Sequence, residues 1–166
     1  LFKNLVNHDD VDKEYLRKIL HYKCGSGTFR MNVALSELPN FKCLPSSGVS
    51  DHHKSGIIFA PTLSYMDKAF TDAKKYGWSK NPIVEMLIPS TVDSSLAPKG
   101  KHVASLFCQQ FAPNLPNNRS WHDERDKAAA TIIDTVNKFA PNFKDSIIGS
   151  SILSVSYTHL TLPTIR

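Results

Sequence analysis

Alternating apolar and polar positions along the chain predict strands. The clearest case is Thr28 to Leu38, where apolar residues share one parity and polar residues the other. That is the pattern of a strand with one buried face. Its apolar positions are Phe29, Met31, Val33 and Leu35, and its polar positions include Arg30 and Asn32. Three further runs predict strands at Ile57 to Phe59, Ile83 to Ile88 and His102 to Phe111.

Helical spacing of apolar residues predicts three helices. The first covers about Asp10 to Tyr22, with acidic residues in its first turn and basic residues near its end. The second starts at Ser64, where Asp67 makes a variant capping box, and stops at Gly77. The third starts at Ser120 and ends before Pro141, and its apolar stripe is Ala128, Ile132, Ile133, Val136 and Phe139.

The order of these elements predicts the fold class. Strands with two-residue alternation are separated by helices and by loops at 39–54 and 90–100. This arrangement is typical of an α+β domain with a mixed, largely antiparallel sheet. No internal repeat, low-complexity tract or linker divides the chain, so we expect one domain.

Composition narrows the function classes without choosing one. The chain has 166 residues, 41% of them hydrophobic and 21% charged, which excludes wholesale disorder. The net charge is +5, but basic residues do not cluster beyond Lys74-Lys75 and the Lys99/Lys101 pair, so we expect no nucleic-acid binding. The three cysteines are far apart and predict reduced thiols. We expect no transmembrane segment, because no apolar run approaches the length of a membrane span.

The two ends look unlike the rest. The chain begins with Leu1 and has no initiator Met, which suggests a fragment. Residues 155–166 resemble translated sequencing-adapter read-through, and we expect them to be a non-native tail. Tyr157 and His159 should therefore carry no chemistry.

Motifs for self-sufficient catalysis are incomplete. The stretch Cys24-Gly25-Ser26-Gly27 lacks the third glycine of a dinucleotide loop and predicts a helix end and turn. His52-His53 has no third ligand at suitable spacing and predicts two surface loop histidines, with a metal pair as the alternative. Cys108 shares parity with His102 but lies six residues away, about 20 Å, too far for an activated thiol.

Polar residues inside the predicted strands are the remaining site candidates. Asn32, Gln109 and Gln110 either line a ligand cavity on one sheet face or face solvent. Glu85 shares parity with Ile83 and Leu87, and a buried carboxylate there would need a partner. We take Asn32, Glu85 and Gln109 as candidates for a substrate cavity.

Four stretches together resemble a known family. They are 29–41 (FRMNVALSELPNF), 81–90 (NPIVEMLIPS), 96–107 (LAPKGKHVASLF) and 140–146 (APNFKDS). In this order they resemble the middle section of the phytoene desaturase-like FAD-dependent oxidoreductases, and within them the branch of pyridine nucleotide-disulfide oxidoreductase domain-containing proteins. The resemblance runs from about Leu1 to Ser154.

The resemblance implies that residues 1–154 are a substrate-domain fragment of a two-domain flavoprotein. Such a domain has a mixed sheet with helices packed on one face and a flavin-facing cavity on the other. It also implies that FAD is held by a missing domain of the same chain, so we expect no FAD on this fragment alone. The parent would transfer hydride to or from a small, largely apolar organic substrate. The location would be cytoplasmic in a bacterium and the mitochondrial matrix in a eukaryote.

Two alternatives remain open. One is a stand-alone, cofactor-free ligand-binding or protein-interaction module. The other is a cysteine- or metal-dependent hydrolase that uses Cys108 or His52.

Overall fold

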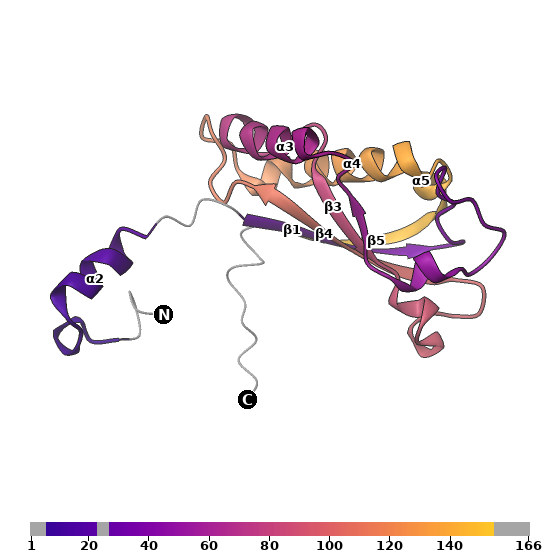
Figure 1. Ribbon diagram of the computed structural model, residues 1–166, viewed down its shortest axis with the longest axis horizontal. Coiled ribbons are helices and arrows are strands. Elements are labelled where there is room, and N and C mark those ends of the chain that lie inside the picture. The colour runs from indigo at the N-terminus through magenta and orange to yellow at the C-terminus, as the bar shows by residue number, and fades with distance from the viewer. Residues whose placement is uncertain (1–5, 23–26, 155–166) are drawn as a thin grey trace.

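A five-stranded sheet in the order β2-β3-β4-β1-β5 forms the centre of the structure (Figure 1). The computed structural model describes residues 6–22 and 27–154. The strands are β1 (Gly27–Leu35), β2 (Ile57–Phe59), β3 (Ile83–Leu87), β4 (His102–Phe111) and β5 (Ile147–Leu153). The helices are α2 (Lys13–Leu20), α3 (Leu63–Tyr76), α4 (Trp121–Phe139) and α5 (Phe143–Ser146), with 3₁₀ turns η1 (His8–Asp10), η2 (Asp51–Lys54), η3 (Pro89–Thr91) and η4 (Ser94–Leu96). All four strand pairings are antiparallel, so the predicted α+β class is confirmed.

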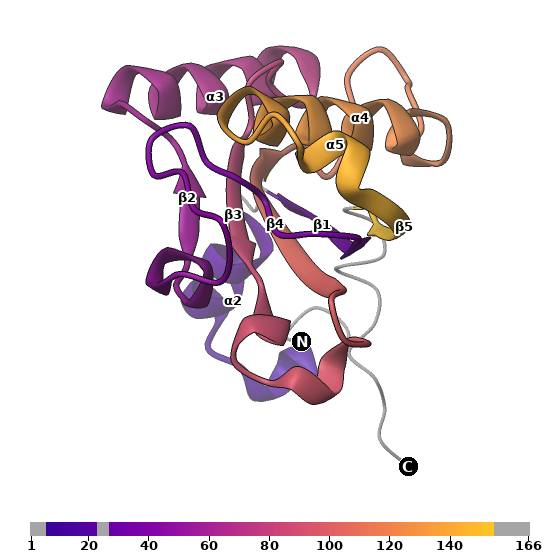
Figure 2. The same ribbon diagram turned by 90° about the vertical axis from the view of Figure 1, so that its right-hand side faces the viewer.

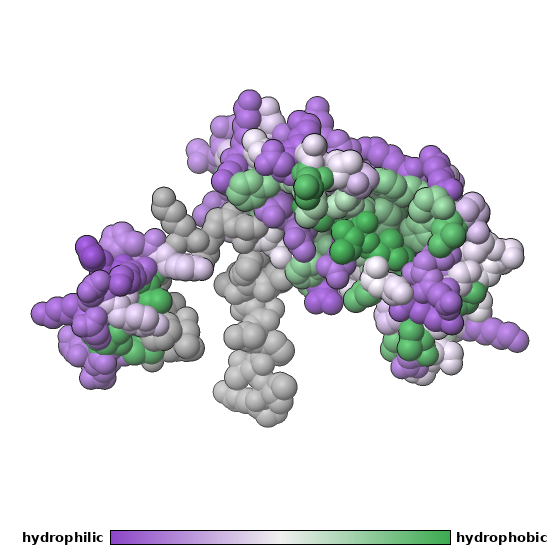
Figure 3. Space-filling view, in the orientation of Figure 1, coloured by the Kyte–Doolittle hydropathy of each residue, from purple (hydrophilic) through white to green (hydrophobic). Residues whose placement is uncertain are grey.

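The hydrophobic core lies between this sheet and a layer of helices. Figures 1 and 2 show α3, α4 and α5 together over one face of the sheet. The apolar positions predicted for the first long strand are all buried in this core, where they meet Ile132 and Val136 of α4. The outer surface of the helices is mostly polar, whereas apolar side chains gather below them around β2 and β3 (Figure 3). The expectation of helices packed on one face is therefore confirmed.

A bulge near the end of β4 keeps its last aromatic residue in the core. Gln110 has φ 66°, and the register with β1 shifts at this point, so that Gln109 is opposite Thr28 and Phe111 is opposite Gly27. The extra residue rotates the strand, and Phe111 therefore faces the same side as Cys108 instead of the side of Gln109. Phe111 is fully buried and packs 5.2 Å from the ring of Phe29.

The helix caps test the boundary predictions. Ser120 caps α4 as predicted, since its side chain accepts the N–H of His122. The predicted start of the preceding helix at Ser64 is wrong, because Thr62 is extended and accepts the N–H of Tyr65. Gly77 ends α3 as predicted, with φ 98°. The positive φ favours glycine there, and an added Cβ would lie 2.5 Å from Leu115 Cδ2, so that the leucine side chain would also have to shift.

The two ends of the described chain differ from the sequence expectation. The first helix begins at Lys13 and not at Asp10, because Asp12 is the N-cap and accepts the N–H of Tyr15 at 2.9 Å. No residue of α2 is buried. The pattern did not predict α5 and β5. β5 pairs with β1 alone and exposes most of its residues, so it lacks the alternation that identifies half-buried strands.

Candidate functional site: the open face of the sheet

In the described part of the chain, α3, α4 and α5 all lie over one face of the sheet, and the side chains on the other face follow from strand alternation. Residues that lie between the core positions of β1, β3 and β4 project to this side. On β4 the core positions are Ala104, Leu106 and Cys108, so Ser105 and Phe107 belong to the opposite face. We call this side of the sheet the open face.

All three residues taken from the sequence as cavity candidates lie on the open face. Asn32 is on β1, Glu85 on β3 and Gln109 on β4. Glu85 is opposite Phe107, and Gln109 is two residues further along β4, so these two are diagonal neighbours. Asn32 is opposite Ser105, four residues from Gln109, and is exposed. The fold therefore brings Glu85 and Gln109 close together and leaves Asn32 apart from Gln109.

A hollow on the open face has a volume of about 200 Å³. It is lined by Arg30, Glu85, Leu87, Ser105 and Phe107. Of the sequence candidates only Glu85 lines it. The sequence already placed Arg30 among the polar positions of its strand. It did not indicate that Phe107 lines the hollow, because that depends on how β4 is aligned with both neighbouring strands.

The strand register places three of these residues in one row. Glu85 of β3 and Arg30 of β1 are both opposite Phe107 of β4. Two strand spacings separate Arg30 from Glu85, about 10 Å between their backbones. Arg30 Nη2 donates a long hydrogen bond of 3.5 Å to Ser105 Oγ. Neither charge has an ion-pair partner within 4.0 Å among residues 6–22 and 27–154.

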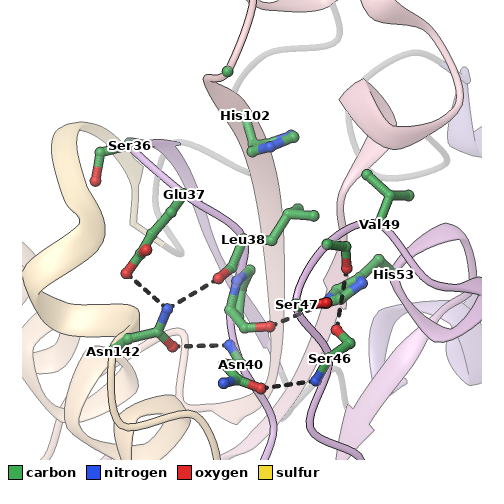
Figure 4. A pocket seen from close by; sticks show the side chains of 13 residues that line it. Ser36, Glu37, Leu38, Asn40, Ser46, Ser47, Val49, His53, His102 and Asn142 are labelled. Atoms are coloured by element: carbon green, nitrogen blue, oxygen red, sulfur yellow. Dashed lines mark hydrogen bonds between the residues drawn. The ribbon is translucent and has the colours of Figure 1, made fainter.

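A second, more polar pocket of about 420 Å³ lies beside α5 and is drawn in Figure 4. We call it the α5 pocket. Asn142 dominates one wall: its Nδ2 donates to Glu37 Oε1 at 2.9 Å and to the Leu38 carbonyl at 3.0 Å. Its Oδ1 accepts the N–H of Asn40 at 2.8 Å. The side chain of Asn40 in turn accepts the N–H of Ser46. These groups are bonded to one another across the loop that follows β1, which leaves them little capacity for a ligand.

His53 forms the opposite wall of the α5 pocket, and the expectation of two surface histidines is wrong. His53 is 1% exposed. Its Nδ1 accepts the N–H of Ser50 at 3.1 Å, and its Nε2 donates to the Pro39 carbonyl at 3.0 Å. This pair of bonds selects the neutral tautomer with the proton on Nε2. The burial arises because η2 folds His53 under the loop, which residue spacing alone does not indicate.

His52 and His102 border the same region. The rings of His52 and His53 lie 4.0 Å apart, and His52 Nε2 is buried without a hydrogen-bond partner. Burial lowers the pKa of His52. The neighbouring His53 lowers this pKa further, and Asp51 has a smaller, opposing effect. Burial, with a contribution from His53, also lowers the pKa of His102. No group of three or more His, Cys, Asp or Glu side chains in the described part of the chain is placed to hold a metal ion.

A third hollow, of about 540 Å³, lies at the end of α3. Two of its charged residues, Arg119 and Asp72, are also engaged in the fold. Arg119 stacks on Trp78 at 5.2 Å, pairs with Glu124 at 3.4 Å and donates to the Tyr76 carbonyl. Asp72 accepts from Ser79 at 2.9 Å. Like Asn142 in the α5 pocket, these two side chains hold the fold together.

The structure argues against a cysteine-dependent hydrolase that uses Cys108. Cys108 is fully buried in the core, and burial raises the pKa of its thiol far above the ordinary value. A thiol there is neither ionised nor reachable by a substrate. Cys43 is exposed. The expectations for Cys24 to Ser26 and for residues 155–166 lie outside the described residues, whereas Gly27 begins β1.

No helix of the described part of the chain is long and apolar enough to cross a membrane.

Comparison with known proteins points to an oxidoreductase relationship. The chain is 31% identical over 158 residues to pyridine nucleotide-disulfide oxidoreductase domain-containing protein 2 of Rattus norvegicus, and equally to that of Mus musculus. In both cases the match covers 92% of this chain and 27% of the relative. The chain thus spans about a quarter of the length of these curated relatives. No family model matches it.

Proposed function

We propose that this chain is the substrate-side part of an FAD-dependent oxidoreductase of the phytoene desaturase-like kind, and that the open face forms one wall of its substrate cavity. One observation carries this assignment. Similarity to an oxidoreductase-domain protein covers 92% of a chain in whose described part α3, α4 and α5 all pack on the same face of the sheet. A sheet with one covered face and one free face can support a cavity that a second domain closes.

The described residues do not fit an FAD site of their own. A dinucleotide pyrophosphate is normally held where a parallel strand leads through a glycine-rich turn into a helix. Every strand pairing in the described sheet is antiparallel. We therefore assign FAD to the remaining three quarters of a parent of the relatives' length. That parent would work in the cytoplasm of a bacterium or in the matrix of a mitochondrion.

This chain would contribute binding and orientation. Phe107 and Leu87 offer apolar surface at the open face, 38% and 48% exposed. Glu85 and Gln109 add polar groups beside that surface, and Asn32 extends the polar part along β1. Closing such a face with a second domain would exclude water from the substrate and strengthen each polar contact within the cavity.

The test is flavin content. The reading frame is extended at its source locus, the full-length parent is purified, and its visible absorption is measured. We expect stoichiometric bound FAD in the parent and no tight FAD binding to the 166-residue chain in titration calorimetry. A parent without flavin overturns the assignment and favours a cofactor-free binding module. Tight FAD binding by the chain alone would overturn the division of labour between the two parts.

A further inference from the structure

The open-face hollow combines an apolar floor with a single cation. Its floor is Phe107, and Leu87 of β3 extends the apolar surface toward Ile58 of β2, which is 64% exposed. Arg30 stands on the other side of Phe107, on β1. The apolar surface therefore runs from Phe107 diagonally across Leu87 to Ile58, alongside Glu85, which is opposite Ile58, and the guanidinium stands at the opposite end.

Arg30 and Glu85 are the two charges that line this hollow. Seven cations of the described chain have a carboxylate within 4.0 Å, such as Lys127 with Glu124 at 2.8 Å and Lys144 with Asp134 at 2.9 Å, and Arg30 is not among them. Arg30 has only the 3.5 Å bond to Ser105. Covering the open face would remove water from the guanidinium, and an unpaired charge is costly once it is desolvated. Whatever fills the hollow must bring an anion to Arg30.

Glu85 determines the orientation of a bound ligand in the hollow. It shares the row with Arg30 but stands on the far side of Phe107. A carboxylate near Glu85 would meet a like charge, whereas one near Arg30 meets a planar donor that matches its geometry.

We propose that the hollow binds an organic acid with an apolar body. The carboxylate pairs with Arg30, and the hydrocarbon lies over Phe107 and Leu87 toward the β2 edge. This names the substrate class of the cavity and so rests on the proposed function. The substrate is then amphipathic and not wholly apolar.

The test is a nuclear magnetic resonance titration of the isotope-labelled 166-residue chain with octanoate, 1-octanol and octyltrimethylammonium. Octanoate should shift the backbone amides of Arg30, Leu87 and Phe107 and bind more tightly than the other two probes. Arg30→Gln should weaken octanoate binding about tenfold, the size of one charge-assisted hydrogen bond. Arg30→Lys should keep part of the affinity.

Two further variants sharpen the result. Glu85→Gln removes a like charge about 10 Å from the bound carboxylate and should tighten octanoate binding about twofold. Arg125→Gln is the matched control, because Arg125 lies on α4 over the other face of the sheet, and it should change nothing. The amide spectrum of each variant reports whether it is folded.

Several outcomes overturn the inference. They are equal binding of octanoate and 1-octanol, tighter binding of octyltrimethylammonium, an Arg30→Gln variant that binds as well as the wild type, shifts confined to other parts of the chain, and no binding at all. A flavin-free parent would instead overturn the proposed function while leaving octanoate binding to Arg30 in place, so the two failures can be told apart.

Discussion

The open face and the α5 pocket are both hollows that contain polar side chains, yet they use them differently. In the α5 pocket, Asn142 and His53 direct their polar atoms to backbone groups of the loop after β1 (Figure 4). On the open face, Arg30 and Glu85 have no ionic partner among the described residues, and apolar surface separates them.

This difference indicates where function should be sought. A polar group bonded within the fold contributes to stability, and its loss leaves a partner unsatisfied. A polar group without such a bond costs little to the isolated chain and remains available to a ligand. The α5 pocket is twice as large, about 420 Å³ against 200 Å³, but size does not decide which one binds.

The largest effect should come from His53→Ala. The substitution removes the buried imidazole ring, which contacts Phe41, and leaves the Ser50 N–H and the Pro39 carbonyl without the hydrogen bonds that His53 makes to them. We expect the free energy of unfolding to fall by about 3 kcal/mol, measured by urea denaturation. His52→Ala is the matched control and should cost less than half as much, because His52 Nε2 has no hydrogen bond to lose. Equal losses would show that the network does not depend on His53.

Asn142→Ala should have the next largest effect. The substitution breaks the bonds to Leu38, Asn40 and Glu37 at once. Because these groups are only partly shielded from water, we expect a loss of about 2 kcal/mol in the same measurement. The exposed Asn114→Ala serves as the control and should leave stability unchanged. If Asn142→Ala lowers the free energy of unfolding no more than Asn114→Ala does, the loop is held by other contacts.

Acidification should destabilise the α5 pocket more than the open face. The folded-state pKa values of His52 and His102 lie below their ordinary value of 6.5, chiefly because of burial. The unfolded chain therefore binds more protons below that pH. The stabilising contribution is full above about pH 6.5 and is lost as the pH falls toward the lowered values. Urea midpoints measured across this range should drop, and His102→Asn should flatten the slope. An unchanged slope in that variant would exclude His102 as a source.

The smallest effects should come from the open face. Arg30→Gln and Glu85→Gln should each change the free energy of unfolding by less than about 0.5 kcal/mol, because neither removes an ion pair of the described fold. Thermal or urea unfolding of the two variants tests this directly. A loss comparable to that of Asn142→Ala would end the distinction between the two regions.

Much of the fold could be predicted because its signals are local. The alternation around Phe29 and Val33 identified both β1 and its buried face, and Ser120 marked the start of α4. β5 escaped because an edge strand with Gly149 and two serines has no half-buried pattern. The burial of His53 escaped because it depends on the loop that folds over η2 and not on the residues beside it.

By itself the sequence determined which side of each strand its residues occupy, since successive side chains alternate by covalent geometry. Asn32 was thereby assigned to the polar side of its strand, and Glu85 to the same side as Ile83 and Leu87. Only the tertiary structure decided that Glu85 and Arg30 share a row with Phe107, because register depends on pairing between strands that are not adjacent in their local sequence. The helix layer over the other face decided which polar positions remain open to a ligand.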